Sequence, residues 1–351
     1  MDNTDRTELL CIGNAVVDAF APADPAWLEM HHIAAGAQHI EMEKARQMLG
    51  SLRSADGSAV LSSGGAVANV AKIAAMMGVR TAFAGSSGRD ELAVFFENEL
   101  KQAGVLPFVK RTEGETGLCL VLDAGGENRI AASPGASLNF DEHDVPEALI
   151  AAADAVVLDG YMLDRKTLVH KVLQLASRHG IPIALDAASV FQVKEKTEAI
   201  LHYSRNYPMI VFMNADESIT FYNTIRKGDS NTDAMSEREK TDFILREICP
   251  ALKGMTEGDI FPVLVIKLGG KGAVVLAGGN IHRAGTFAIK PKNTVGAGDA
   301  FCAAFVCAWI RGRPIRECAW LGNKVAKKLL AVPGTSIKKE KFASLAKLLK
   351  K

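Results

Sequence analysis

The stretch "KPKNTVGAGDAFCAAF" (residues 290–305) joins a glycine-rich turn to a helix that is almost entirely apolar. Glycines at positions 296 and 298 let the backbone turn sharply and let a ligand approach the main chain without meeting a Cβ. The apolar helix, residues 299–312, is expected to be buried. Its first N–H groups lack partners within the helix and face the turn. The stretch therefore predicts an anion pocket beside Asp299, at the start of a buried helix.

Outward from this stretch, short apolar runs alternate with longer helical patterns. The expected strands are residues 8–13, 80–85, 154–160, 181–186, 209–214 and 261–269. The expected helices are residues 66–78, 91–104, 165–180 and 235–248. The strands are near-continuous in apolar residues, as a sheet buried on both faces requires. The alternation predicts an α/β fold with a doubly wound, mostly parallel sheet.

Two segments interrupt this alternation, residues 14–61 and 105–135. They hold short alternating strands such as residues 117–122, with turn signals close by. We expect them to meet in space as a small discontinuous lid domain. The α/β core is then expected to comprise residues 1–13, 62–104 and 136–351.

Composition limits the classes of function. Of the 351 residues, 48% are apolar and 23% charged, which is typical of a soluble globular protein. With 41 basic and 40 acidic residues the net charge is +1, so no global field favours nucleic acid or a membrane surface as a partner. The six cysteines show no metal-ligand spacing, and no apolar run reaches the ~18 residues of a spanning helix. We expect a cytoplasmic protein.

Asp299 has two interpretations at this level. It is either a capping residue at the helix start or a general base held beside the anion pocket. Phosphoryl transfer needs such a pair, because the transferred group carries negative charge while the acceptor hydroxyl loses a proton. Acyl transfer would need a nucleophile paired with a histidine, and none of the eight histidines lies in a comparable motif.

The segment "NTVGAGDAFCAAF" resembles the C-terminal signature of the PfkB (ribokinase-like) carbohydrate kinases. Other segments resemble the family in the family's order, so the likeness covers almost the whole chain. They are "GNAVVD" (13–18), "SGGAVANVAKIAAMMG" (63–78), "AGSSGRDELAVFFENELKQAGV" (84–105), "NADE" (214–217), "KLGGKGA" (267–273) and "LGNKVAKKL" (321–329). One departure is Ala93, where the family has glycine.

The resemblance implies a Rossmann-like core with a small β-sheet lid, and ATP and Mg²⁺ as cofactors. Asp299 would be the general base, and the amides of Gly296, Ala297 and Gly298 would form the anion hole. Asn214 and Glu217 would position Mg²⁺, largely through water. A capping pair at a helix start is the alternative for these two residues.

The resemblance also implies which residues bind the acceptor and the nucleotide. Asp18 and Asn69 would form hydrogen bonds with substrate hydroxyls. The alternatives are a turn residue on a lid strand for Asp18 and a polar residue early in a helix for Asn69. Further acceptor-site residues would be Asn14, Gly64, Gly65 and Arg129, the last being either a lid arginine near phosphate or a solvated hairpin residue. Gly269, Gly270 and Asn323 would flank the adenine of ATP.

Within the family the chain looks most like the adenosine-kinase-like branch. Gln38, Tyr161 and Phe191 could then surround a purine, with core packing as the alternative for the aromatic residues. A ribose- or fructose-type sugar remains a second acceptor class, and a non-catalytic ligand-binding protein on the same fold a third hypothesis. A monomer and a homodimer both stay open.

Two departures bear on the site. Asn293 stands where the signature commonly has Asp, and the loss of that negative charge argues against activation by potassium. The "LDAAS" segment (185–189) lacks a proline often found there, so we expect the loop beside the substrate to differ in shape.

Overall fold

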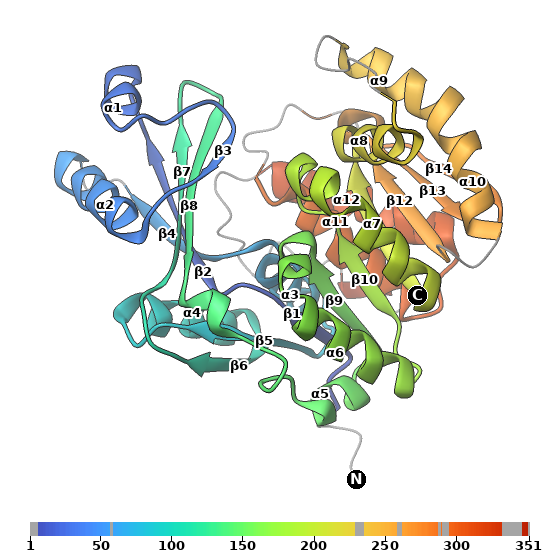
Figure 1. The fold of residues 1–351 in the computed structure, drawn as a ribbon, viewed down its shortest axis with the longest axis horizontal. Helices are drawn as coiled ribbons and strands as arrows, with labels where there is room; N and C mark the ends of the chain where they lie inside the picture. The colour runs from blue at the N-terminus through green and yellow to red at the C-terminus, as the bar shows by residue number, and fades with distance from the viewer. Residues whose placement is uncertain are drawn as a thin grey trace.

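The computed structural model describes residues 6–56, 59–228, 235–257, 262–286, 289, 295–331 and 346–349, which contain two β-sheets (Figure 1). Within these residues the larger sheet has nine strands in the order β14-β13-β12-β11-β10-β9-β1-β5-β6. Their bounds are β1 (Leu9–Ile12), β5 (Thr81–Ser87), β6 (Val105–Arg111), β9 (Ala155–Asp159), β10 (Ile183–Asp186), β11 (Met209–Asn214), β12 (Val263–Lys267), β13 (Ala273–Ala277) and β14 (Asn280–Ala284). Neighbouring strands run parallel from β6 to β12, whereas β13 and β14 are antiparallel. The predicted mostly parallel sheet is confirmed.

Helices cover both faces of the large sheet, because successive strand side chains point to opposite faces. Leu9 and Cys11 enter one core layer, while Leu10 and Ile12 enter the other. The first layer is covered by α3 (Ala66–Met76), α4 (Glu91–Ala103), α11 (Ala297–Trp309) and α12 (Ile315–Leu330). The second is covered by α5 (Glu147–Ala152), α6 (Lys166–Arg178), α7 (Val190–Asn206), α8 (Ala215–Arg226), α9 (Glu237–Phe243) and α10 (Cys249–Glu257).

Helix α11 lies in the first of these layers, as its apolar sequence predicts. All its residues from Ala300 to Ala308 are buried. Phe305 contacts Phe212 of β11 edge to face, with 5.2 Å between the ring centroids. The core therefore fixes the position of the helix that starts at the glycine-rich turn.

The second sheet stands beside the large one and has the strand order β3-β8-β7-β2-β4 among the described residues (Figure 1). Its strands are β2 (Val16–Pro22), β3 (Ala37–His39), β4 (Val60–Gly64), β7 (Thr116–Asp123) and β8 (Asn128–Gly135). Helices α1 (Pro25–Met30) and α2 (Met42–Asp56) cover one face, where Leu118, Leu120 and Leu122 are buried. Alternation along the strands leaves Asp18 and its register partner Cys119 on the opposite face.

One expectation about the second sheet is wrong. We expected all of residues 105–135 to belong to it, but β6 pairs in parallel with β5 in the large sheet. Among the described strands β6 ends the sheet, so after the buried Val105 its side chains alternate between exposed and half-buried. An edge strand of the large sheet therefore shows the same period-two pattern as a strand of the small sheet.

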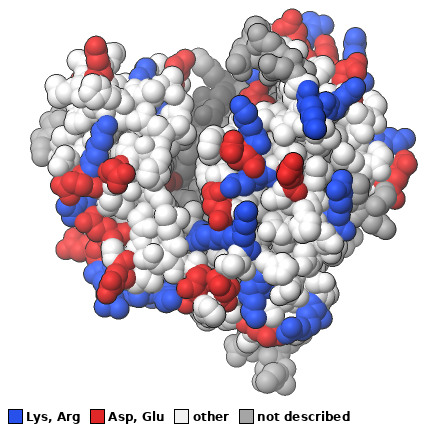
Figure 2. Space-filling view, viewed as in Figure 1, with Lys and Arg blue, Asp and Glu red and all other residues white. Residues whose placement is uncertain are grey.

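The face seen in Figure 2 is hollowed between the second sheet and the helices beside the large sheet. Acidic and basic side chains are interspersed over this face. Among the helices of the described chain, none combines the length and apolar character needed to cross a membrane.

Candidate active site

The carboxyl ends of parallel strands gather polar side chains at one edge of the large sheet. Strands β9, β10, β11 and β12 end at Asp159, Asp186, Asn214 and Lys267, respectively. Open α/β sheets bind ligands at this edge, near the point where the strand order reverses. The reversal here lies at β1, which pairs with β9 on one side and β5 on the other. The start of α11 brings Asp299 close enough to feel the charges of Asp186 and Lys267.

Asp299 lies half-buried in the first turn of α11, three residues after the left-handed Gly296 (φ 77°). Asn69 of α3 donates a hydrogen bond from Nδ2 to Asp299 Oδ2 over 2.9 Å. Burial raises the pKa of the Asp299 carboxyl to about 6, while the hydrogen bond from Asn69 acts in the opposite direction. With a pKa of about 6, the carboxylate is mostly ionised at neutral pH. Within the described residues no amide of α11 donates to it, so its oxygens remain free to accept a proton.

Asp18 lies on the face of the second sheet that points away from α1 and α2, and it is 7% exposed. A Cβ on Gly64 would come within 2.1 Å of the Asp18 carboxyl, so only glycine lets β4 lie this close to it. Burial raises the pKa of Asp18 to about 7, although the ammonium of Lys72 lowers it. Asp18 also accepts a hydrogen bond from Cys119 and feels the charge of Asp299, so the two sheets bring both carboxylates to one region.

Lys72, a buried residue of α3, ties the end of β4 to the core, which we did not predict. Its Nζ donates to the Ser63 carbonyl and, over 3.4 Å, to Ser62 Oγ. The Glu99 carboxylate of α4 accepts from the Ser63 amide at 2.5 Å. The chain leading into Gly64 and Gly65 is therefore anchored by two opposite charges, the buried Lys72 ammonium and the half-buried Glu99 carboxylate.

Asn214 and Glu217 form a reciprocal capping box at the start of α8. Glu217 Oε2 accepts from the Asn214 amide and Oε1 from Asn214 Nδ2, both over 2.7 Å. Burial raises the pKa of Glu217, although the Lys267 ammonium opposes this. Each carboxylate oxygen already accepts a hydrogen bond, which suits contact with Mg²⁺ through water better than direct ligation. In the described part of the chain, no cluster of three or more His, Cys, Asp or Glu is placed to hold a metal.

Lys267 and Asp186 are further site residues that sequence reasoning missed. Lys267 Nζ lies 2.6 Å from Asp186 Oδ2, and a Cβ on Gly298 would lie 3.3 Å from the same nitrogen. The one signal for them was position, since each is the last residue of a strand in the same parallel sheet.

Asn14 and Tyr161 lie at the same edge of the sheet. Arg165 donates from Nη2 to Asn14 Oδ1 over 2.5 Å, and from Nη1 to the Ser137 carbonyl over 2.9 Å. Tyr161 is 43% exposed, and its amide donates to the carboxylate of Asp159. Burial raises the pKa of Asp159 to about 7, although Arg165 lowers it.

Gln38 and Arg129, which were predicted to bind the substrate, form hydrogen bonds within the region of the second sheet instead. Gln38 Oε1 accepts from the Ala34 amide over 2.9 Å. Arg129 donates from Nη1 to the Ile33 carbonyl over 2.6 Å. No described hydrogen bond or ion pair joins either residue to Asp299.

The structure describes the three residues predicted to bind the nucleotide, Gly269, Gly270 and Asn323. Gly269 (φ 52°) and Gly270 form a short turn after β12, with open space where their Cβ atoms would lie. Asn323 of α12 is buried and donates from Nδ2 to the carbonyls of Ala284 and Gly285. Asn293, on which the potassium expectation rests, lies outside the described residues.

The raised pKa values predict an acid limb in the pH profile of catalysis. Asp299 and Asp18 have pKa values of about 6 and about 7. The roles that the resemblance implies for them, general base and acceptor of hydroxyl hydrogen bonds, need both carboxylates ionised. We expect kcat/KM to fall as the pH drops through this range, because it reports the free enzyme's groups. In Asp18→Asn the limb should move towards pH 6. A kcat/KM that stays constant between about pH 5 and about pH 8 would contradict this assignment.

The chain matches the family model described as "pfkB family carbohydrate kinase" over residues 38–341. It is 26% identical to a 5-dehydro-2-deoxygluconokinase of Bacillus anthracis over 277 residues, covering 75% of this chain and 78% of the relative. Its fold is similar to that of an adenosine kinase from Sinorhizobium meliloti, with TM-score 0.82, 25% identity and coverage of 98% and 99%. It is also similar in fold to a probable sugar kinase from Rhizobium etli, with TM-score 0.81, 23% identity and coverage of 98% and 99%.

The family match spans most of the chain, and the Rossmann-like core with a second small sheet agrees with it. The named relatives are kinases of sugars or nucleosides. The chain therefore belongs to the PfkB family of carbohydrate kinases.

Proposed function

We propose that this kinase transfers the terminal phosphoryl group of ATP to a primary alcohol of a ribose-containing nucleoside or of a sugar. The observation that supports this most strongly is the contact between Asp299 and Asn69 at the start of α11. It joins an ionisable carboxylate, a hydrogen-bond donor for a hydroxyl and the amide end of a buried helix. Phosphoryl transfer to an alcohol needs these three elements together.

Each residue of the site has a role in this proposal. Asp299 accepts the proton of the attacking hydroxyl, while the amides of Gly296, Ala297 and Gly298 stabilise negative charge on the phosphoryl oxygens. Asp18 and Asn69 orient the acceptor, because a carboxylate accepts from two neighbouring hydroxyls at once.

MgATP supplies the phosphoryl group when it is bound. Asn214 and Glu217 would hold Mg²⁺ through water, and Gly269 and Gly270 would lie against the adenine. Open space at both glycines is consistent with a flat ring lying on the backbone there. Asn323 would support that side by fixing the end of β14, because its amide donates to Ala284.

A nucleoside is the first acceptor class. Tyr161 is 43% and Phe191 68% exposed, although large aromatic side chains are usually buried. Both follow carboxyl ends of core strands, where a purine could stack on them. The Sinorhizobium meliloti neighbour is named an adenosine kinase, which supports this class.

A free sugar or sugar acid is the second class. The polar group of Asn14, Arg165 and Asp159 lies beside Tyr161 and is rich in donors and acceptors for hydroxyls. The Bacillus anthracis relative is named a 5-dehydro-2-deoxygluconokinase.

A substrate screen by ADP release tests the proposal. Its acceptors are adenosine and other nucleosides, ribose- and fructose-type sugars, and 5-dehydro-2-deoxygluconate. For a nucleoside acceptor we expect Phe191→Ala to raise KM, with Val190→Ala, an exposed neighbour, as control. A sugar acceptor should be insensitive to Phe191→Ala. Failure of every alcohol to stimulate ADP release would overturn the proposed reaction.

A further inference from the structure

The Lys267 side chain places a positive charge inside the site, beside the glycine-rich turn. Lys267 is the last residue of β12 and pairs with Asn214, the last residue of β11. Its ammonium lies so close to Gly298 that a Cβ there would approach it to 3.3 Å. Its side chain is only 13% exposed, so water screens its charge weakly.

Three carboxylates surround this ammonium. Asp186 is hydrogen-bonded to it over 2.6 Å, and Glu217 and Asp299 interact with it through charge. Burial alone lowers the pKa of Lys267, but Asp186 and Glu217 outweigh burial and raise it above its usual value. The side chain is therefore a permanent cation at neutral pH.

The ammonium has donors to spare. Among the residues that the structure describes, Asp186 is its one hydrogen-bond acceptor, whereas a lysine ammonium carries three N–H groups. Two donors consequently remain for a ligand at the amide end of α11.

The Asp186 carboxylate is held in place and binds the Lys267 ammonium. Its Oδ1 accepts from the Ala188 amide over 3.1 Å, which leaves Oδ2 facing Lys267. Asp186 is 9% exposed, and it ends β10, so both the backbone and the carboxylate are fixed.

We propose that Lys267 is a further catalytic residue, whose ammonium contacts the transferring phosphoryl group beside the Gly298 amide, and that Asp186 positions it. The inference rests on the proposed kinase function. During transfer, the bond between the terminal phosphorus and its bridging oxygen breaks, and the acceptor oxygen bonds to that phosphorus. The acceptor proton goes to Asp299, and Lys267 gives up no proton but balances charge on the phosphoryl oxygens.

The alternative is that Lys267 only neutralises Asp186. Removing one partner of a buried ion pair destabilises a protein strongly, whereas removing both is often tolerated. The double variant Asp186→Asn with Lys267→Gln therefore separates the two roles. Under our proposal the double variant recovers thermal stability relative to Lys267→Gln but keeps its low kcat.

Turnover and nucleotide binding provide the readouts. We expect Lys267→Gln to lower kcat by about 10²-fold, as the loss of one transition-state donor does elsewhere. In titration calorimetry, Lys267→Gln should weaken binding of MgATP about tenfold more than binding of MgADP, because only the former carries the terminal phosphate.

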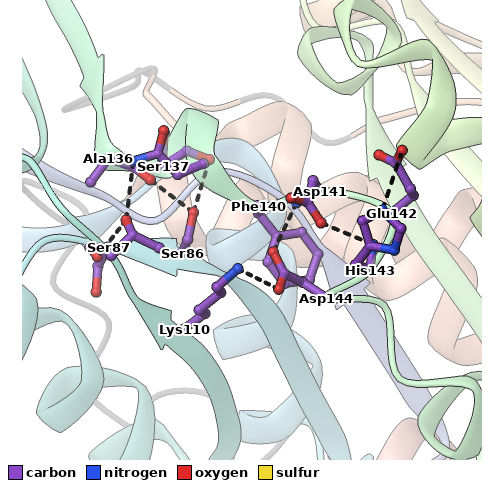
Figure 3. A network of polar contacts seen from close by, with 12 residues as sticks. Ser86, Ser87, Lys110, Ala136, Ser137, Phe140, Asp141, Glu142, His143 and Asp144 are labelled. Atoms are coloured by element: carbon purple, nitrogen blue, oxygen red, sulfur yellow. Dashed lines mark hydrogen bonds and ion pairs between the residues drawn. The ribbon is translucent and has the colours of Figure 1, made fainter.

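Lys110 offers a matched control. Figure 3 shows its ammonium facing Asp144. Lys110 Nζ lies 2.6 Å from Asp144 Oδ1, which equals the distance between Lys267 Nζ and Asp186 Oδ2. Lys110 lies on β6, at the other end of the large sheet, and no described contact joins it to Asp299. Lys110→Gln should leave kcat and both nucleotide affinities unchanged.

Two outcomes would overturn the role of Lys267 and leave the kinase function intact. One is recovery of wild-type kcat in the double variant, and the other is equal weakening of MgATP and MgADP binding. A wild-type protein that binds neither nucleotide and transfers no phosphoryl group would overturn the kinase proposal and this role with it.

Discussion

Replacement of Asp299 by Asn is expected to lower kcat by about 10²–10⁴-fold, the usual contribution of a general base. The amide of Asn cannot take a proton from the acceptor hydroxyl. Its Oδ1 can still accept the hydrogen bond that Asn69 donates, so the geometry of the site should persist. KM for the acceptor should change far less than kcat.

The stability of Asp299→Asn distinguishes lost chemistry from lost folding. The pKa of Asp299 in the folded protein is about 6, above the ordinary value of 3.8, so the folded state holds this proton more tightly than the unfolded state. Stability from this group is therefore lost as the pH rises through the range between the two values. At about pH 8 the neutral Asn variant should melt no lower than the wild type.

Asp242→Asn is the control, because Asp242 is an exposed residue of α9. It should leave kcat and the melting temperature unchanged. Undiminished turnover in Asp299→Asn would refute the role of this carboxylate as the base. A large fall in its melting temperature at about pH 8 would show that its loss of activity comes from misfolding.

Replacement of Phe305 by Ala is expected to cost about 3–5 kcal/mol of unfolding free energy, the range for truncating a buried phenylalanine. Phe305 is fully buried in α11. It packs edge to face on Phe212 at 5.2 Å and stacks beside Phe301 at 6.1 Å between ring centroids. The cavity would lie between the large sheet and the helix that carries Asp299.

Urea unfolding followed by circular dichroism measures this cost. Phe191→Ala is the matched control, because the same substitution at a residue that is 68% exposed should change stability by less than about 0.5 kcal/mol. If Phe305→Ala lost no more stability than Phe191→Ala, α11 would not be the core helix that we describe.

Much of the large sheet could be predicted from sequence because its strands are buried on both faces. Residues 209–213, for example, form a continuous apolar run that nothing but a buried strand or helix explains, and they lie in β11. The place of β6 in the large sheet was not predicted, because its alternating exposure matches that of a strand in a half-solvated sheet. The pattern of apolar residues along a strand indicates which of its faces are buried, but it does not indicate which strands lie beside it.

The site residues also divide into those that a local sequence pattern reveals and those that it does not. Glycines and Asp299 could be recognised because backbone conformation and helix termini leave a local signature, confirmed in the left-handed Gly296 at the start of α11. Asn214 and Glu217 lie three residues apart, and the capping box between them is also local. Lys267, Asp186 and Lys72 have no such signature, because each meets its partners across different strands and helices.

The sequence by itself determined the alternating α/β core, the buried helix and its glycine-rich start, because these depend on apolar periodicity and backbone freedom within a few residues. Only the tertiary structure decided which charges meet. The parallel register places Lys267 level with Asn214, and packing brings Asn69 against Asp299, 230 positions away along the chain. Contacts at such separations arise from the packing of whole elements, so no local pattern records them.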